Sequence, residues 1–120
     1  MHDFKRLEIW RRSRALAIAL HALTVNFRRA GHAKLRAQLT DAVDSISTNI
    51  AEGCGSSTKR ELARFLDISI KSASETEHHL IVAGDFGLIS RKDWRRYSAE
   101  TIDIRKMIFG YRRQVLESDR

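Results

Sequence analysis

The sequence predicts an all-α protein, an antiparallel up-down four-helix bundle. The chain of 120 residues contains no proline, the residue that interrupts helices most strongly. Apolar residues recur at intervals of three and four, which is the period of a helix with one buried face. Four helices are expected over about 6–29, 34–52, 58–84 and 90–117, within a single domain spanning 1–120.

Glycines and capping residues mark the expected ends of these helices. Gly31 is a typical helix stop, and Gly53 and Gly55 end the second helix. Thr58 and Ser90 are each followed three residues later by an acidic residue, which is typical of helix N-caps. The main apolar faces are Ile9, Leu16, Leu20, Leu23 and Phe27 in the first helix, Leu35, Leu39, Ala42, Ile46 and Ile50 in the second, and Tyr97, Ile104, Ile108, Tyr111 and Val115 in the fourth.

Polar residues interrupt the apolar faces of the second and third helices. Burying polar groups without partners is costly, so we expect these residues to hydrogen-bond across the two helices and to fix their register. The alternative is a catalytic pair of carboxylates, Glu52 and Glu75, with Ser72 and His79 as the only neighbouring candidates for a nucleophile or base. The expected network comprises Gln38, Ser45, Asn49, Glu52, Ser72 and Glu75.

Two short motifs resemble chemical sites. The segment Glu75-Thr-Glu-His78 has the spacing of carboxylate-bridged metal bundles, but that architecture needs two such motifs and the chain has one. We interpret His78 and His79 as solvated histidines and expect no metal and no cofactor. Gly53-Cys-Gly55 could carry a reactive thiol, although an incidental cysteine in a helix-ending turn explains it as well. We therefore expect a protein that is not an enzyme.

The cellular setting follows from what the sequence lacks. There is no apolar run of about 18 residues and no signal-peptide pattern, so we expect a cytoplasmic protein without a membrane partner. The single cysteine, Cys54, excludes a disulfide within the chain.

The net charge of +7 is spread unevenly. Residues 1–36 carry nine Lys and Arg against two Asp and Glu, and residues 86–120 carry nine against five, whereas residues 37–85 carry four against eight. Basic ends of this kind favour a polyanionic partner such as RNA or DNA, and a solvated basic surface is the alternative. The candidate nucleic-acid-binding residues are Arg11, Arg12, Arg14, Arg91, Lys92, Arg95, Arg96, Lys106 and Arg113.

A second apolar stripe lies away from the main core face on two helices. Ile18 and Val25 lie on the far side of the first helix, and Ile102, Phe109 and Leu116 recur every seven residues along the fourth. Stripes on two helices are typical of a packing interface, so we expect a homo-oligomer. The same stripes could instead contact another protein.

Several motifs together resemble the four-helix bundle family of 23S rRNA intervening-sequence proteins. They cover nearly the whole chain, and the Ser-Ile-x-x-Asn-Ile-Ala-Glu-Gly segment is the most specific. The motifs are Phe4-x-x-Leu7-x-Ile9-Trp10, Leu35-x-x-Gln38-Leu39-x-x-Ala42-x-x-Ser45-Ile46-x-x-Asn49-Ile50-Ala51-Glu52-Gly53, Phe65-Leu66-x-Ile68 and Ser72-x-x-Glu75.

This resemblance implies a bacterial protein that forms a ring-like homopentamer. It also implies similarity to the accessory variability protein of diversity-generating retroelements, a basic pentamer that binds nucleic acid and a reverse transcriptase. Thr40 and Asp41 stand where family members often have basic residues, and Lys71 and Thr76 where small and apolar residues are usual. We expect binding of nucleic acid, RNA above all, through the first and fourth helices. The alternative is a scaffold that docks a partner such as a nucleic-acid-processing enzyme.

Overall fold

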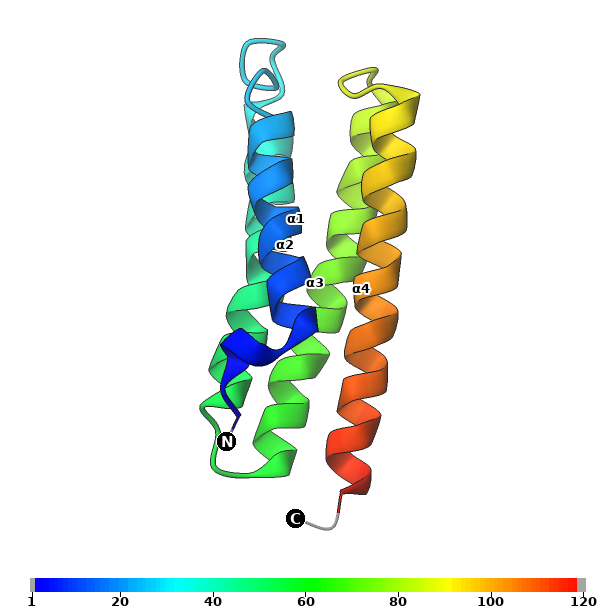
Figure 1. Ribbon diagram of the computed structural model, residues 1–120. Coiled ribbons are helices and arrows are strands. Elements are labelled where there is room, and N and C mark those ends of the chain that lie inside the picture. The colour runs from blue at the N-terminus through cyan, green and yellow to red at the C-terminus, as the bar shows by residue number, and fades with distance from the viewer. Residues whose placement is uncertain (1, 119–120) are drawn as a thin grey trace.

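Four α-helices lie side by side in the computed structural model, which describes residues 2–118 (Figure 1). They are α1 (Glu8–Leu23), α2 (Ala33–Cys54), α3 (Lys59–Asp85) and α4 (Arg91–Glu117), with a short 3₁₀ helix, η1 (Phe4–Arg6), before them. The described part of the chain contains no strand, so the predicted all-α class is confirmed. The body measures 51 × 20 × 20 Å.

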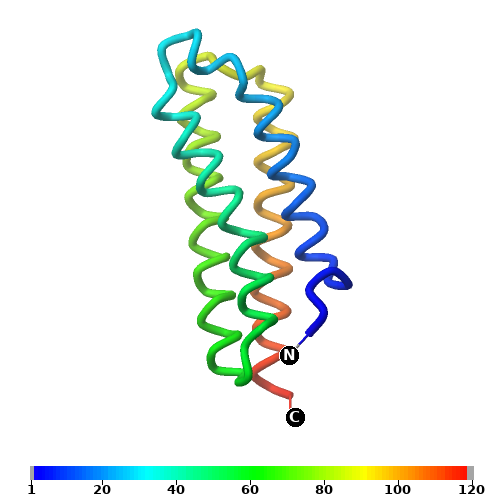
Figure 2. The backbone as a smooth tube through the Cα atoms, turned by 90° about the vertical axis from the view of Figure 1, so that its left-hand side faces the viewer, coloured from blue at the N-terminus to red at the C-terminus, as the bar shows by residue number. Residues whose placement is uncertain are grey.

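Successive helices are joined at alternate ends of this body. The α1–α2 and α3–α4 turns lie at one end, and the α2–α3 turn lies at the other end together with both chain termini (Figures 1 and 2). The helices α2, α3 and α4 begin and end within two residues of the predicted bounds. Thr58 and Ser90 are N-caps as predicted, because their hydroxyl oxygens accept hydrogen bonds from the backbone N–H groups of Glu61 and Asp93, both at 3.1 Å.

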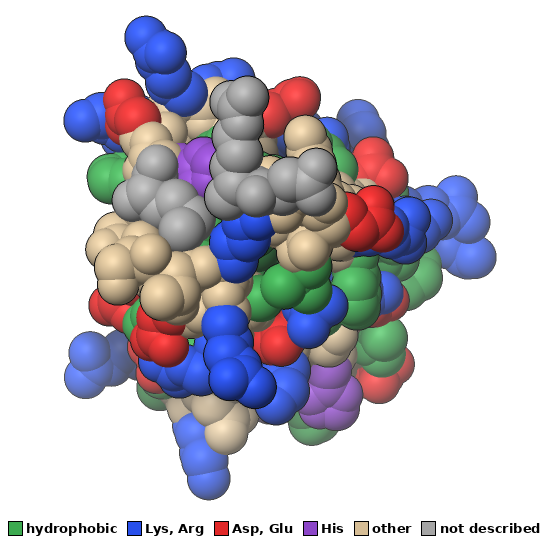
Figure 3. Space-filling model, turned by 90° about the horizontal axis from the view of Figure 1, so that it is seen from below, with side chains coloured by type: hydrophobic (Ala, Val, Ile, Leu, Met, Phe, Trp, Pro, Cys, Tyr) green, Lys and Arg blue, Asp and Glu red, His purple; other side chains and the backbone are tan. Residues whose placement is uncertain are grey.

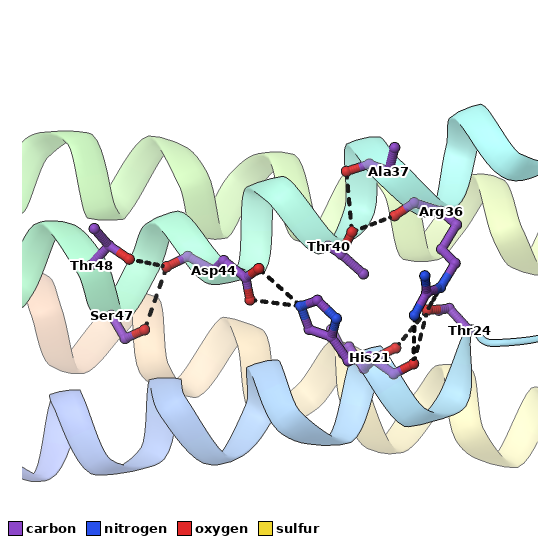
Figure 4. A network of polar contacts seen from close by, with 9 residues as sticks. His21, Thr24, Arg36, Ala37, Thr40, Asp44, Ser47 and Thr48 are labelled. Carbon is purple, nitrogen blue, oxygen red and sulfur yellow. Dashed lines mark hydrogen bonds and ion pairs between the residues drawn. The ribbon is translucent and has the colours of Figure 1, made fainter.

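The first helix ends at Leu23, before the predicted limit of residue 29. Side-chain hydrogen bonds to its last backbone carbonyls cap it there. The Thr24 hydroxyl donates to the carbonyl of Leu20 at 2.8 Å. Arg36 of α2 donates to the Thr24 hydroxyl and to the carbonyl of His21, both at 3.2 Å (Figure 4). The carbonyl of His21, which a longer helix would have used, is thereby satisfied from a neighbouring helix.

The chain beyond Thr24 then turns to bury an aromatic ring. Phe27 is 2% exposed and packs with Leu35 and Ala83, which closes the core at this end. The backbone N–H of His32 donates to the carbonyl of Phe27 at 2.7 Å, and Gly31 adopts a φ of 87°, which favours glycine. Burial of Phe27 therefore requires a turn where the periodicity alone predicts continued helix.

The main core runs between all four helices. Its fully buried side chains include Leu20, Leu39, Ile46, Ile50, Leu62, Leu66, Leu80, Ile104 and Ile108. Trp94, Tyr97 and Tyr111 of α4 pack against it while half-buried. In the part of the chain that the structure describes, none of the helices combines the length and the apolar character needed to cross a membrane.

The closest approach between helices occurs where α2 meets α3. A Cβ atom at Gly53 would lie 2.9 Å from both Leu62 Cδ1 and Phe65 Cβ, so only glycine fits there. Further along the same pair, the Ser69 hydroxyl donates to the backbone carbonyl of Ile46 at 2.9 Å. Small residues therefore set both the distance and the register of α2 and α3.

Replacing Gly53 with alanine is expected to destabilise the protein by about 1–3 kcal/mol, because the added methyl group meets the Cβ atom of Phe65 and the backbone must shift. The free energy of unfolding in urea measures this loss. The control is Gly110→Ala in α4, where a new Cβ meets nothing within 4 Å. Since alanine has the higher helix propensity, Gly110→Ala should be neutral or stabilising by up to about 1 kcal/mol. Equal effects at the two glycines would contradict the close approach.

Candidate nucleic-acid interface

Interhelical ion pairs divide the predicted basic residues into two groups. Arg12 of α1 belongs to the paired group, since its guanidinium donates to Glu100 of α4 at 2.5 Å and lies 3.6 Å from Asp103. The hydrogen bond to Glu100 raises the pKa of Arg12 above its ordinary value. Arg12 is half-buried and ties α1 to α4, whereas we predicted it as part of an open basic surface.

Two further arginines join α4 to α3. Arg105 pairs with Glu77 at 2.6 Å, and Arg112 pairs with Asp67 at 2.7 Å. Their side chains are between 23% and 34% exposed, so solvent screens both pairs and each contributes little to stability. Their main consequence is that Glu77 and Asp67 are already paired and do not neutralise other basic side chains of α4.

The outer face of α4 keeps its positive charge. Among residues 2–118, none of its remaining basic side chains forms an ion pair, and all are exposed. Arg95, Lys106 and Arg113 lie on one side of the helix, spaced by eleven and seven residues. Arg96 lies 5.2 Å from the centre of the Tyr97 ring, where it still faces solvent. The exposed set is Arg91, Lys92, Arg95, Arg96, Lys106 and Arg113.

The basic residues predicted on the first helix are engaged locally. Arg11 donates to the backbone carbonyls of Lys5 and Arg6, at 3.2 and 2.8 Å. Arg14 lies 5.8 Å from the centre of the Trp10 ring. Both remain exposed, but their geometry is fixed by the start of the chain. α1 therefore offers a smaller open basic surface than α4 does.

The end of the molecule that carries the α2–α3 turn has a mixed charge. In the view from that end, basic and acidic side chains alternate around the rim (Figure 3). Arg64 pairs there with Glu61 at 2.8 Å, and the Arg64 hydrogen bond lowers the pKa of Glu61. The unpaired cations of α4 thus form a more strongly basic surface than this end does.

The polar residues of α2 and α3 form a smaller network than predicted. The Ser72 hydroxyl donates to the Ser45 hydroxyl oxygen at 2.8 Å, and Asn49 donates to the hydroxyl and carbonyl oxygens of Ser45 at 2.8 and 2.9 Å. The side chains of Gln38, Glu52 and Glu75 are exposed, and within the described range they make no hydrogen bond. These three are therefore accessible to solvent rather than buried between α2 and α3.

Gln38 and Glu75 instead line a surface groove between α2 and α3. Its volume is about 430 Å³, and Ser45, Ser72 and His79 also line it. Burial, together with the neighbouring His78, lowers the pKa of His79. Nothing in this set supplies a paired nucleophile and base.

The segment Glu75–His78 and the turn at Cys54 each resembled a chemical site in the sequence. In the stretch from residue 2 to residue 118, no group of three or more His, Cys, Asp and Glu could hold a metal ion. Cys54 is 1% exposed, and burial raises the pKa of its thiol. Both properties oppose a reactive thiolate.

Most of the predicted interface residues lie on the surface. Ile18 and Val25 are 58% and 59% exposed on and just after α1, and Phe109 and Leu116 are 50% and 46% exposed on α4. Ile102 is half-buried. On α1 the small residues Ala15 and Ala22 flank Ile18 on the same exposed face, which leaves room for a close helix neighbour.

Some contacts between distant segments were not predicted from the sequence. The network of His21, Arg36 and Asp44 joins α1 to α2, with the His21 Nε2 atom 2.9 Å from both Asp44 carboxylate oxygens (Figure 4). Spacing of basic and acidic residues within one helix gives no signal for such pairs. A groove lined by Trp94 at the α3–α4 turn was likewise not predicted.

Comparison with solved structures identifies the fold class. The chain is similar to a crystal structure from Bacteroides thetaiotaomicron VPI-5482, described as a protein of unknown function from the S23 ribosomal protein family. The TM-score is 0.81 at 19% sequence identity, covering 88% of this chain and 95% of that chain. At this identity the similarity establishes the four-helix fold alone. Comparison with curated proteins gave no match.

The family follows from the sequence itself. Residues 5–110 match the 23S rRNA-intervening sequence protein family, and the chain belongs to it. The family name indicates an RNA-related setting, in agreement with the resemblance drawn from the signature motifs.

Replacing Asn49 with alanine is expected to lower the free energy of unfolding by about 0.5–1.5 kcal/mol, because its two hydrogen bonds to Ser45 are lost beside the buried Ser72. Thr48→Ala is the control, since Thr48 is exposed and bonds only to its own helix at Asp44. Chemical denaturation compares the two variants. A loss below about 0.5 kcal/mol for Asn49→Ala would show that the network contributes nothing to stability.

Proposed function

We propose that this protein is a non-enzymatic, oligomeric, antiparallel four-helix bundle that binds RNA through the basic outer face of α4, with the start of α1 as a smaller second contact. The open basic face of α4 carries the proposal, because three acidic residues of α3 and α4 are paired with arginines that tie the helices together. These residues are Glu77, Glu100 and Asp67.

The spacing on α4 suits a phosphate backbone. Arg95, Lys106 and Arg113 repeat along one side of a helix of 27 residues, so they present charge over an extended line rather than at a point. Contacts of this kind give affinity without base-specific recognition. Family membership supports RNA as the nucleic acid.

The double variant Lys106→Ala/Arg113→Ala is expected to weaken RNA binding and to reduce the slope of log affinity against log salt by about one to two, because each lost phosphate contact removes nearly one released counterion. Fluorescence anisotropy of a labelled RNA over a salt series measures both quantities.

The matched control removes two lysines that lie outside α4. Lys34 and Lys71 are exposed on α2 and α3, so Lys34→Ala/Lys71→Ala lowers the net charge equally without touching α4. It should change the salt slope little. Equal slopes in the two double variants, or no RNA binding by the unmodified protein at about 50 mM salt, would contradict the α4 interface.

We further propose a ring-like homo-oligomer, a pentamer by the family resemblance, built from two different apolar surfaces. One surface is the exposed stripe of Ile18 and Val25 on and just after α1, and the other is the α4 stripe of Ile102, Phe109 and Leu116. The α4 stripe lies on the same side of the helix as Arg95, Lys106 and Arg113, so these basic residues would border the contact between protomers and bind RNA at its edge. Because the two surfaces differ, contact between them is heterologous, and repetition closes a ring if the rotation permits.

Mixing two variants tests this arrangement. Ile18→Glu and Phe109→Glu each spoil one of the two surfaces, so each alone should be a monomer of 13.8 kDa by light scattering. In an equimolar mixture, the intact α1 surface of one variant meets the intact α4 surface of the other, and a heterodimer should form. A monomeric unmodified protein would contradict self-assembly. Monomers alone in the mixture would contradict a heterologous contact.

The alternative function is a scaffold for another protein, in the manner expected from the likeness to the accessory variability protein. The exposed Phe109 and Leu116 support it, because they could contact a nucleic-acid-processing enzyme as well as a second copy of the chain. A monomer in dilute solution that gains a partner on co-purification through these two residues would favour the scaffold.

A further inference from the structure

A groove at the α3–α4 turn exposes aromatic and aliphatic surface. Its volume is about 330 Å³, which is room for a single flat ring system. Trp94 forms one wall while half-buried, and Ile81 opposite is 43% exposed. The lining residues are Ile81, Gly84, Asp85, Ile89, Arg91 and Trp94.

Gly84 leaves the edge of the indole ring open. A Cβ atom at this position would lie 3.6 Å from Trp94 Cδ1, so any larger side chain would cover the ring. The groove therefore leaves part of the Trp94 indole ring accessible to a ligand.

Positive charge surrounds this apolar groove. Arg91 lines it, and Lys92 and Arg95 follow in the first turns of α4, all exposed. Arg28 and Arg29 are exposed in the α1–α2 turn, at the same end of the bundle (Figure 1). Asp85 is the one acidic residue of the lining, and its carboxylate repels a phosphate from the groove itself.

We propose that this groove binds one unpaired base of single-stranded RNA, stacked on Trp94, while the flanking phosphates contact Arg91, Lys92 and Arg95. This inference rests on the proposed RNA-binding function and adds its substrate class. The apolar lining with its one acidic group can accept an uncharged base. The cationic rim attracts the phosphates of the RNA backbone on either side of that base. Stacking on aromatic side chains beside a basic surface is the usual mode of single-strand binding.

Base-paired RNA does not fit this arrangement. The bases of an A-form helix are stacked on one another, and its deep major groove is closed to side chains. A base can enter a groove of this size only after leaving the stack, which costs a duplex a few kcal/mol. The α4 face can contact phosphates of either form, so only the groove distinguishes single-stranded from double-stranded RNA.

The fluorescence of Trp94 reports occupancy of the groove directly. Trp10 is the only other tryptophan in the chain, so the Trp10→Phe variant leaves Trp94 as the sole tryptophan, which a long excitation wavelength selects over the two tyrosines. We expect a short single-stranded RNA oligonucleotide to quench this emission in step with binding measured by anisotropy. The same oligonucleotide annealed to its complement should bind without quenching. Binding of the single strand with unchanged Trp94 emission would overturn the proposal.

A variant that fills the groove tests its contribution to affinity. Gly84→Leu keeps every lining side chain and should weaken single-strand binding about tenfold, with duplex binding unchanged, because stacking of one base contributes on that order. Phe86→Ala is the matched control: Phe86 is 59% exposed at the same end, rests on His32 at 4.8 Å between ring centres, and lies outside the groove. It should bind both RNAs normally.

Other outcomes separate the two proposals. Single-strand affinity that is unchanged in Gly84→Leu, or lowered equally in Phe86→Ala, would overturn the groove and leave the α4 interface standing. No binding of either RNA by the unmodified protein would overturn both. Circular dichroism verifies that Gly84→Leu is folded, and the Trp94 quenching experiment needs no groove variant.

Discussion

The close contact of α2 with α3 is the constraint on which the rest of the bundle depends. Gly53 brings the end of α2 against Leu62 and Phe65 of α3, at a separation that no side chain could tolerate. With the helices this near, small hydroxyl groups reach across, from Ser69 to the Ile46 carbonyl and from Ser72 to Ser45. The two serines of the family signature, Ser45 and Ser72, are therefore a consequence of close packing. Larger apolar residues at these positions would push the two helices apart.

The outer helices are held by a different kind of contact. Arg12 pairs with Glu100, and Arg105 and Arg112 pair with Glu77 and Asp67. Pairs with this much exposure stabilise a fold only modestly. They nevertheless decide the electrostatics, because they place the acidic groups between helices and leave unpaired cations facing outward on α4. The same charges distributed at random would give a net charge of +7 without an interface.

Local sequence patterns predicted the helices. The features that these patterns did not predict depend on contacts between distant segments. Periodicity and N-caps such as Thr58 and Ser90 act within one or two turns, so the sequence reveals them directly. The end of α1 depends on Arg36 from the next helix, and the pairing of Arg12 depends on Glu100, far along the chain. Glu52 and Glu75 lie at helical spacing from buried residues, yet point to solvent, because spacing gives the side of a helix only to within about a quarter turn.

Assembly and RNA binding, if both proposals hold, are energetically linked. A single protomer offers an RNA only the few phosphate contacts of one α4 face. Binding through such contacts weakens steeply as the salt concentration rises. A ring would repeat that face, so a bound RNA segment would raise the effective concentration of the next segment at the neighbouring protomer. Spoiling the apolar α1 surface at Ile18, with Arg11 and Arg14 left unchanged, would then weaken binding to long RNA far more than to short RNA. Because a scaffold of monomers would bind both lengths with equal affinity per site, RNA length separates these two functions without a change to any basic residue.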